Sequence, residues 1–547
     1  MQTALVRCDL RGAPRAKFSR GVRAWLLMSL VLYGTICGSV VNAEDAAKPA
    51  ERSSKETAAP PADLETRFRQ LEESHRRLLQ RFDEAFQEED GWTRAVTGTP
   101  AEASEPQKIQ LVQAVQDANE LFDDQPPDVR TDEPAPVFPE QPRDLQGVFF
   151  EGFKWETKDG EYTLNFHSEM QLDTRMYAQA HSNPVNQFGF YIPRMRMIFN
   201  GRLTKPIEYN VSINKGLGDL DLLDAYFNFN YDSRVQFRIG RYRVPFTYDW
   251  FALSNQFLMT PERSVFALNQ GYNRNFAAMV HGEIWDEKME YAVALANGPR
   301  NSYYDTNSSK DLLVFVNARP FEQIESLAPL KNLNLGGSLA WGMQDQEPLP
   351  VDFRTSANAT ESTGTLKGVS TFLELNDDVR EQGVRQLWEL HLAYYYKQLS
   401  LLGAYDAGFN TYLQTRTQNV VRVPTQAFHV QFGYFLTGEE IDRRTFVKPL
   451  KPFDLRAGRR GPGAFEVQAR FDHFALGNDL FTGELADPNL WTNRVNTIDT
   501  GVNWYLNTYT KIYFDWQHAM YGSNVLFSPT GLTRHNDLFW IRFQYYF

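Results

Sequence analysis

Short segments of alternating apolar and polar residues run from Leu145 to the C-terminus. In FHSEMQLDTRMY the apolar residues Phe166, Met170 and Leu172 alternate with polar ones, and FEVQARFDH repeats the pattern from Phe465. Because successive side chains of a strand point to opposite faces, each segment predicts a strand with one apolar and one polar face. The segments are rich in aromatic residues and are separated by turn residues, so this region predicts an all-β fold.

The last nine residues, FWIRFQYYF, place five apolar side chains from Phe539 to Phe547 on one face of a strand. This ending resembles the C-terminal strand of bacterial outer-membrane barrels. Strands of about ten alternating residues are long enough to cross a bilayer. Since every backbone group in hydrocarbon must be paired, such a sheet has to close. We therefore predict a transmembrane antiparallel β-barrel over residues 145–547; a soluble all-β protein with a polar interior is the alternative.

The alternation and the turn signals predict about sixteen strands, an even number as expected of such barrels. They are expected at 161–177, 188–201, 206–214, 221–231, 234–243, 273–284, 287–296, 311–320, 332–341, 386–396, 398–408, 425–436, 464–475, 495–506, 509–519 and 536–547. Tight turns alternate with long connections, notably 243–273, 297–310 and 342–385. Short turns belong to the periplasmic end of such barrels and long loops to the outer end.

The N-terminal part of the chain differs from the strand region. Residues 1–43 carry six arginines and lysines, then the apolar run AWLLMSLVLYGTICGSVV and a small-residue site at Val41-Asn42-Ala43. This order predicts a cleaved signal peptide and export, with a membrane anchor as the alternative. Both cysteines of the chain, Cys8 and Cys37, lie inside this segment, so the mature protein is expected to have no disulfide and no thiolate metal site.

Residues 44–143 predict an acidic linker on the periplasmic side. Its ends, 44–61 and 123–143, are rich in Ala, Pro, Asp and Glu without any apolar period, which is typical of disorder. Over about residues 62–90, apolar residues recur at alternating steps of four and three, which predicts a short coiled coil and hence an oligomer. A single solvated amphipathic helix would give the same pattern.

Charge is unevenly distributed. The chain has a net charge of -12. The predicted signal peptide has six bases and one acid, and the acidic linker has 12 bases and 23 acids, so about -6 remains for the barrel region. The segment Arg443–Gly463 nevertheless has seven basic residues and one acid. It belongs to the connection 437–463. With both ends of the barrel in the periplasm, counting the strands places this connection at the periplasmic end. We predict that this segment folds into the lumen and forms a positive constriction that prefers anions, rather than hanging in the periplasm. The residues expected there are Lys448, Lys451, Arg456, Arg459 and Arg460.

The polar faces of the strands add candidate pore-lining residues. In YIPRMRMIF the alternation points Arg194 and Arg196 inward. Arginine has forked donors that fit phosphate or carboxylate oxygens, although a single lumen arginine is more often solvated or paired with an acid. The same alternation along the other predicted strands places further charged residues on the lumen side: Arg234, Arg238, Arg470, Lys511 and Arg542, with Asp224, Glu389, Glu466, Asp472, Asp499 and Asp515.

Several segments in order, among them PRMRMIFNG, LLDAYFNF, RIGRYRVPFTYDWFALSNQFLMTPERSV, YNRNFAAMV, FGYFLTGE and TGVNWYLN, resemble the phosphate-selective porins O and P of Gram-negative outer membranes. The resemblance covers most of residues 145–547. It implies a trimeric sixteen-strand barrel, a loop folded inward after the fifth strand at about Val244–Asn273, and an arginine-lined path for phosphate-type anions. The binding positions of the family correspond here to Arg194, Asp224, Ser254 and Arg263.

The chain departs from the family pattern at two places. Where the family commonly has two adjacent arginines, this chain has Pro193-Arg194, and no lysine or arginine lies between Arg243 and Arg263. Fewer cations in a narrow site would weaken the capture of a multiply charged anion, because charge-assisted hydrogen bonds are the strong ones there.

These observations predict a passive outer-membrane channel for small anions, with phosphate or polyphosphate as the suspected substrate. The alternatives are a non-selective or cation-tolerant porin, and an envelope spacer with secondary conduction. The sequence has no HExxH, no phosphate-binding GxxxxGK[ST] and no nucleic-acid-binding signature, so we expect no enzyme, no cofactor and no nucleic acid partner. The expected partners are small inorganic anions, outer-membrane lipid and two further copies of the chain.

Overall fold

The computed structural model describes residues 144–178, 188–216, 220–301, 303–356, 370–526 and 531–547. The chain divides into two units, Met1–Ala135 and Pro136–Phe547, and all described residues belong to the second. The predicted signal peptide, acidic linker and coiled coil lie outside the described residues.

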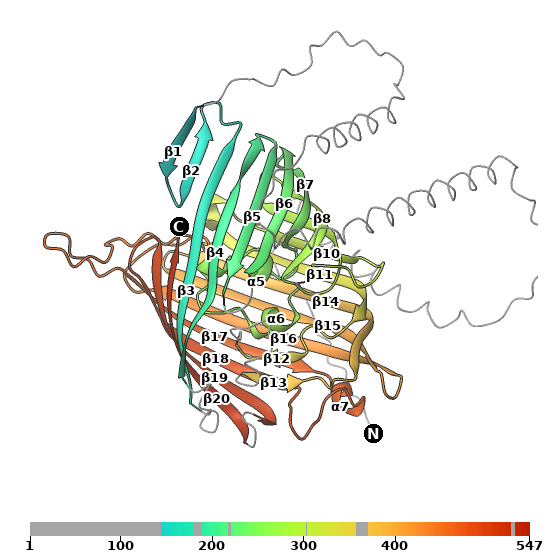
Figure 1. The fold of residues 1–547 in the computed structure, drawn as a ribbon. Coiled ribbons are helices and arrows are strands. Elements are labelled where there is room, and N and C mark those ends of the chain that lie inside the picture. The colour runs from blue at the N-terminus through green and yellow to red at the C-terminus, as the bar shows by residue number, and fades with distance from the viewer. Residues whose placement is uncertain (1–143, 179–187, 217–219, 302, 357–369, 527–530) are drawn as a thin grey trace, which may run out of the picture. The chain divides into compact units, whose positions relative to one another are not determined.

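Within the described residues, sixteen strands pair antiparallel with their neighbours in sequence, and the last strand pairs with the first (Figure 1). The strands of this closed barrel are β3 (Thr163–Tyr177), β4 (Phe188–Thr204), β5 (Ile207–Lys215), β6 (Leu220–Asp232), β7 (Val235–Arg243), β8 (Arg274–Ile284), β9 (Met289–Ala296), β10 (Asp311–Ala318), β11 (Asn332–Gln346), β14 (Val379–Tyr396), β15 (Leu399–Gln414), β16 (Asn419–Phe435), β17 (Ala464–Leu476), β18 (Arg494–Tyr505), β19 (Thr510–Leu526) and β20 (Leu532–Tyr546). The prediction of a closed antiparallel barrel is confirmed.

The outward faces of these strands carry the apolar residues that the alternation assigned to lipid. Leu295, Val430, Phe432, Phe539 and Phe543 are all exposed large hydrophobic side chains. Exposed apolar side chains on the outward faces of the strands are what a membrane-spanning barrel presents to hydrocarbon. In the part of the chain that the structure describes, no helix is long and apolar enough to cross a membrane.

All sixteen predicted strands are present, but several extend further at the long-loop end than the alternation indicated. Strand β14 begins at Val379 rather than at residue 386, β15 continues to Gln414 and β16 begins at Asn419. The added part of β14 reads VREQGVR, which is polar on both faces. Strand ends that leave the apolar layer have no hydrophobic alternation, so the pattern cannot detect them.

A short hairpin precedes the barrel and was not predicted. It consists of β1 (Leu145–Phe149) and β2 (Phe153–Thr157), and β2 pairs with the beginning of β3, with Phe153 opposite Phe166. This edge of β3 is free because β20 ends there. The ring of the terminal residue Phe547 packs against Phe149, Phe153 and Phe166. The C-terminal aromatic residue therefore joins the hairpin to the barrel.

The hydrophobic core lies inside the barrel, where the connection of residues 244–273 is folded. This lumen loop contains α5 (Tyr248–Phe251), the 3-10 turn η2 (Asn255–Phe257) and α6 (Val265–Gln270). The wall beside it carries small buried side chains, Ala277, Ala292, Ala294 and Ala296, in the same apolar cluster as the loop residues. Small residues on the inner wall leave room for the loop backbone to pack closely.

Two further long connections are ordered at the same end of the barrel. One forms a two-stranded sheet of β12 (Asp352–Arg354) and β13 (Thr371–Glu374), and the other contains α7 (Asp479–Thr482). Phe353 and Phe372 pack on Phe474 of β17. At the opposite end, the 3-10 turn η3 (Glu325–Leu330) lies in the connection between β10 and β11.

Candidate functional site

Buried ion pairs fasten the lumen loop to the barrel wall. Glu262 of the loop accepts hydrogen bonds from both guanidinium nitrogens of Arg194 on β4, at 2.8 and 2.7 Å, and one from Arg542 on β20 at 2.9 Å. Arg542 is also paired with Asp173 of β3 at 2.6 Å. Arg194 therefore faces the lumen as predicted, but its fork is occupied by a carboxylate of the same chain.

Two other predicted anion-binding arginines are used in the same way. Arg263 lies over the Trp250 ring at 4.3 Å, pairs with Asp249 at 3.3 Å and donates to the Leu253 carbonyl. Arg470 on β17 donates to the hydroxyl of Thr260 and the carbonyl of Glu262, and is paired with Asp472 and Asp499. Both guanidinium groups are almost fully buried. They anchor the loop instead of presenting donors to the lumen.

The loop backbone is tied to one side of the barrel. The Tyr248 amide donates to Glu389 on β14, and the Val265 amide donates to Asp472 on β17. Lys511 on β19 donates to the Leu258 carbonyl at 2.7 Å. The loop is tied to β14, β17 and β19, and open space remains beside β5 to β7 and the short-turn ends of β8 and β9.

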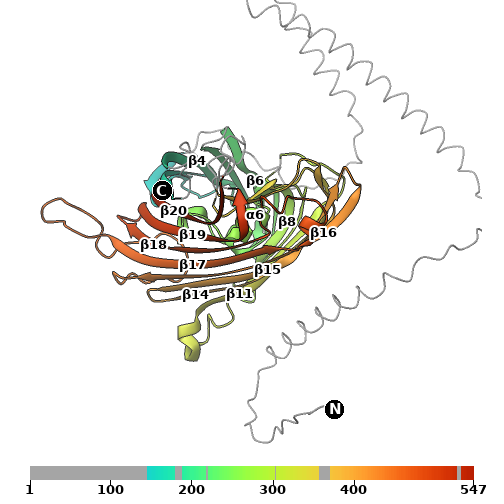
Figure 2. The same cartoon turned by 90° about the horizontal axis from the view of Figure 1, so that it is seen from below.

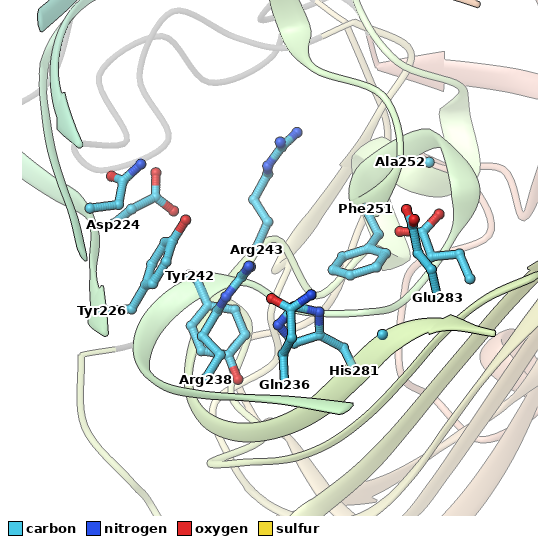
Figure 3. A pocket seen from close by; sticks show the side chains of 13 residues that line it. Asp224, Tyr226, Gln236, Arg238, Tyr242, Arg243, Phe251, Ala252, His281 and Glu283 are labelled. Carbon is cyan, nitrogen blue, oxygen red and sulfur yellow. The ribbon is translucent and has the colours of Figure 1, made fainter. Parts of the chain in front are cut away.

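A cavity of about 440 Å³ occupies this space (Figure 3). Its lining residues include Asn210, Asp224, Tyr226, Gln236, Arg238, Tyr242, Arg243, Phe251, His281, Glu283 and Glu290. A second cavity of about 480 Å³ shares Ala252, Glu283 and Glu290 with the first and extends toward Arg443 and Lys331. The lumen beside the loop is therefore open and lined mainly by charged and polar groups.

Two arginines meet at the roots of the lumen loop. Arg243, the last residue of β7, is the register partner of Arg274, the first residue of β8. Arg274 is paired with Asp224 of β6 at 3.1 Å. Arg243 donates only to uncharged oxygens among the described residues: the carbonyls of Trp250 and Leu253, and the hydroxyl of Ser254 at 3.2 Å.

Two of the predicted pore-lining residues lie on the same inner wall of the barrel as Arg243 and Arg274. Arg196 on β4 is paired with Glu169 at 3.1 Å. Arg238 on β7 lies over the Tyr226 ring at 4.5 Å and donates to the amide oxygen of Asn228. In Figure 3, Arg238 and Arg243 project into the same open space, with Phe251 and Glu283 across from them. Arg196, Arg238, Arg243 and Arg274, with Asp224 and Ser254, are called the arginine wall below.

Arg243 and Arg274 were not among the predicted pore residues. On β8 the inward residues are Asn275, Ala277 and Met279, so strict alternation turns Arg274 outward. Asn273 has φ 58, and Arg274 is the first residue after this left-handed turn, where alternation is not yet established. A signal was present all the same, because both ends of the inward connection carry arginine.

Arg234 does not line the lumen. It lies in the tight turn between β6 and β7, where its guanidinium is 71% exposed and pairs with Asp232 at 2.5 Å. Hydrogen bonds from the Arg234 side chain and amide lower the pKa of Asp232 to about 2. The prediction placed Arg234 inward because alternation was extended one residue beyond the strand.

The prediction that the basic segment folds into the lumen is wrong for the bases that follow Arg444, whereas Arg443 lines the second cavity. Arg444 enters the barrel and donates to Glu466, to the Tyr505 hydroxyl and to the Phe257 carbonyl. The other predicted bases, Lys448, Lys451, Arg456, Arg459 and Arg460, are exposed. Their connection projects away from β17 and β18 in both views (Figures 1 and 2). A run of like charges stays in water unless acids balance it inside, and in the segments that the structure describes only Arg444 of these bases has a buried acid as partner.

No group of three or more His, Cys, Asp or Glu residues within the described ranges is arranged to hold a metal ion. The site consists of guanidinium groups, carboxylates and aromatic rings around an open lumen. Such a site can select and orient small ions as they pass.

A closed sixteen-strand barrel with an apolar outer face and a loop folded into its lumen is the architecture of an outer-membrane porin. The family model of phosphate-selective porin O and P matches residues 162–547, which is more than half of the chain. The protein belongs to this family, and it is an outer-membrane channel protein.

Solved structures similar to this chain are outer-membrane proteins. The anion-selective porin from Comamonas acidovorans has 10% sequence identity and a TM-score of 0.42, over 71% of this chain and 100% of that porin. OmpF of Salmonella typhi, solved in complex with daunomycin, has 10% identity and a TM-score of 0.43, with 74% and 100% covered. The channel DcaP of Acinetobacter baumannii has 8% identity and a TM-score of 0.42, with 72% and 99% covered. No curated protein matches this sequence.

Proposed function

We propose that the protein lets small inorganic anions diffuse passively across the outer membrane, past the arginine wall. The observation that carries this proposal is the direct pairing of Arg243 with Arg274 in the register of β7 and β8. Like charges directly opposite each other destabilise a sheet. The placement of two arginines opposite each other at the roots of the lumen loop therefore favours a functional role for them over a stabilising one.

The charge balance supports an anion preference at this point of the lumen. Asp224 accepts from Arg274, but Arg243 keeps its charge without a hydrogen-bonded carboxylate among the described residues. A positive group in a narrow channel lowers the barrier for anions and raises it for cations. Ser254, whose hydroxyl accepts from Arg243, adds a polar group on the loop side.

Phosphate is the substrate that we propose for testing first, since forked guanidinium donors match its oxygens. The loss of Arg194 and Arg263 to internal ion pairs leaves fewer cations for a multiply charged anion. We therefore expect anion preference with only moderate discrimination of phosphate from chloride.

The test is the zero-current potential of the purified protein in a planar bilayer under a KCl gradient, followed by titration with phosphate. A potential that favours chloride, and chloride conductance that falls as phosphate is added, would support the proposal. A potential near zero or favouring potassium would overturn the anion preference and leave the channel intact.

One observation favours a second function, a cation-tolerant porin. Glu283 and Glu290 are register partners on β8 and β9 and line both cavities. Two carboxylates beside the route would attract cations, so the potential measured above decides between the two functions.

We further propose that the channel is a homotrimer and that residues 44–143 lie in the periplasm, with the heptad segment at about 62–90 as an oligomer contact. Native mass spectrometry of the full chain and of a chain lacking residues 44–143 tests both the trimer and the contribution of the tract. A trimer that persists without the tract would assign the contact to the barrel instead.

A further inference from the structure

The basic connection that fails to enter the lumen forms a small projecting hairpin, residues 448–463, called the basic hairpin here. Asp454 and Gly461 bond to each other through both backbone amides, and the Gly463 amide donates to the Lys451 carbonyl at 2.9 Å. Its five bases are exposed, and its one acid, Asp454, accepts hydrogen bonds from Arg456. The projection therefore has a net positive charge that no function assigned above uses.

The base of the basic hairpin lies on the lipid-facing side of the barrel wall. Phe465 and Trp504 are register partners on β17 and β18, and their inward neighbours are Glu466 and Asn503, so both rings point outward. Phe453 of the hairpin packs on Trp504 at 4.9 Å, and the Trp504 indole donates to the Pro462 carbonyl at 2.7 Å. Outward aromatic residues at strand ends form the girdle that lies at the membrane surface.

Apolar side chains stand between the bases of the basic hairpin. Leu450 is 68% exposed and Leu455 is 74% exposed. Both are adjacent in sequence to a basic residue, Lys451 and Arg456 respectively. A segment that offers large apolar groups and positive charges at the same place matches an interface of acyl chains and anionic headgroups.

The hairpin of β1 and β2 extends the same surface. Lys448 lies 3.7 Å from the Glu151 carboxylate and over the Phe150 ring at 5.7 Å. The Phe150 side chain is itself exposed, as are Phe149 and Val148. The exposed apolar residues next to Lys448 thus extend the apolar surface of the basic hairpin along the end of the barrel that carries the short turns. This end faces the periplasm in outer-membrane barrels.

We propose that the basic hairpin binds the headgroups of anionic phospholipids in the periplasm-facing leaflet, with Leu450 and Leu455 inserted at the acyl boundary. Charge complementarity and the exposed leucines together favour lipid over an acidic protein segment, which would leave the leucines in water. The proposal is independent of the ion preference of the lumen, because it rests on residues outside it.

The test is native mass spectrometry of the full chain in a non-ionic detergent, titrated with phosphatidylglycerol or phosphatidylcholine. The test variant is Lys451→Gln/Arg456→Gln/Arg459→Gln/Arg460→Gln. The matched control, Lys205→Gln/Arg234→Gln/Lys288→Gln/Lys397→Gln, removes the same charge from the tight turns of the same rim. Heat-dependent gel mobility verifies that each variant forms the barrel.

We expect the wild-type chain to bind phosphatidylglycerol more tightly than phosphatidylcholine. The test variant should lose at least about tenfold in affinity for phosphatidylglycerol, since each base near an anionic surface contributes about a fivefold effect. The control should keep its affinity. In a separate variant, Leu450→Ser/Leu455→Ser, affinity for both lipids should fall.

Two results would overturn the proposal. One is an equal loss of affinity for phosphatidylglycerol in the test variant and the control, which would mean a nonspecific effect of net charge. The other is an unchanged affinity for phosphatidylglycerol in the test variant.

Discussion

Arg243 and Arg274 face each other directly across the first pair of β7 and β8, at the two roots of the loop that fills the lumen. Within the described part of the chain, Arg274 has a carboxylate partner, Asp224, and Arg243 has none. The loop thus begins and ends at a pair of like charges, and the open lumen lies beside them. Among the described residues, Arg243 differs in this respect from Arg194, Arg263 and Arg470, which pair with carboxylates.

The substitution Arg243→Gln should reduce the preference for chloride over potassium about fivefold, because a unit charge at 4 Å contributes about 1 kcal/mol in water-like surroundings. The measurement is the zero-current potential in a KCl gradient. Arg234→Gln, in the exposed turn after β6, removes the same charge at the rim and should leave the potential almost unchanged. Equal shifts in both variants would contradict a local role of Arg243.

The substitution Glu262→Gln should destabilise the barrel by about 3 to 5 kcal/mol, because it leaves Arg194 and Arg542 buried without one of their carboxylates. The free energy of unfolding in urea measures this effect. We also expect higher single-channel conductance, since the lumen loop loses its attachment to β4 and β20. Asp232→Asn, which breaks an exposed pair, should change stability by less than about 1 kcal/mol.

The substitution Arg444→Ala should destabilise the protein by about 3 to 5 kcal/mol, because Glu466 would remain buried without its cation. Arg459→Ala removes an exposed arginine from the same connection and should stay within about 0.5 kcal/mol of the wild type. Urea unfolding of both variants is the measurement. Similar stability of the two would mean that Arg444 is not held in the barrel.

The substitution Ala292→Leu should destabilise the barrel by about 1 to 3 kcal/mol, because this fully buried position on the inner wall of β9 has no room for extra methyl groups. Val293→Leu, on the outward face of the same strand, should have little effect. The temperature at which the barrel loses its heat-dependent gel mobility compares the two. A tolerated Ala292→Leu would show that the wall is loosely packed beside the lumen loop.

The sequence by itself determined the barrel, because membrane-spanning strands must alternate and that alternation is local. It also identified Arg194, Arg196, Arg238 and Arg470 as inward residues, since each belongs to a strand with clear parity. It could not identify Arg274, which precedes the regular part of β8, or the hairpin of β1 and β2, which pairs only because β20 ends early.

Only the tertiary structure decided which arginines are available to ions. Arg194, Arg263 and Arg470 find carboxylates or carbonyls from segments far away in the sequence, and those partners neutralise them. The basic hairpin stays outside the lumen because, among the described residues, a buried acid, Glu466, balances only Arg444. Charge pairing depends on distances of a few ångströms between remote segments, and alternation along one strand contains no information about them.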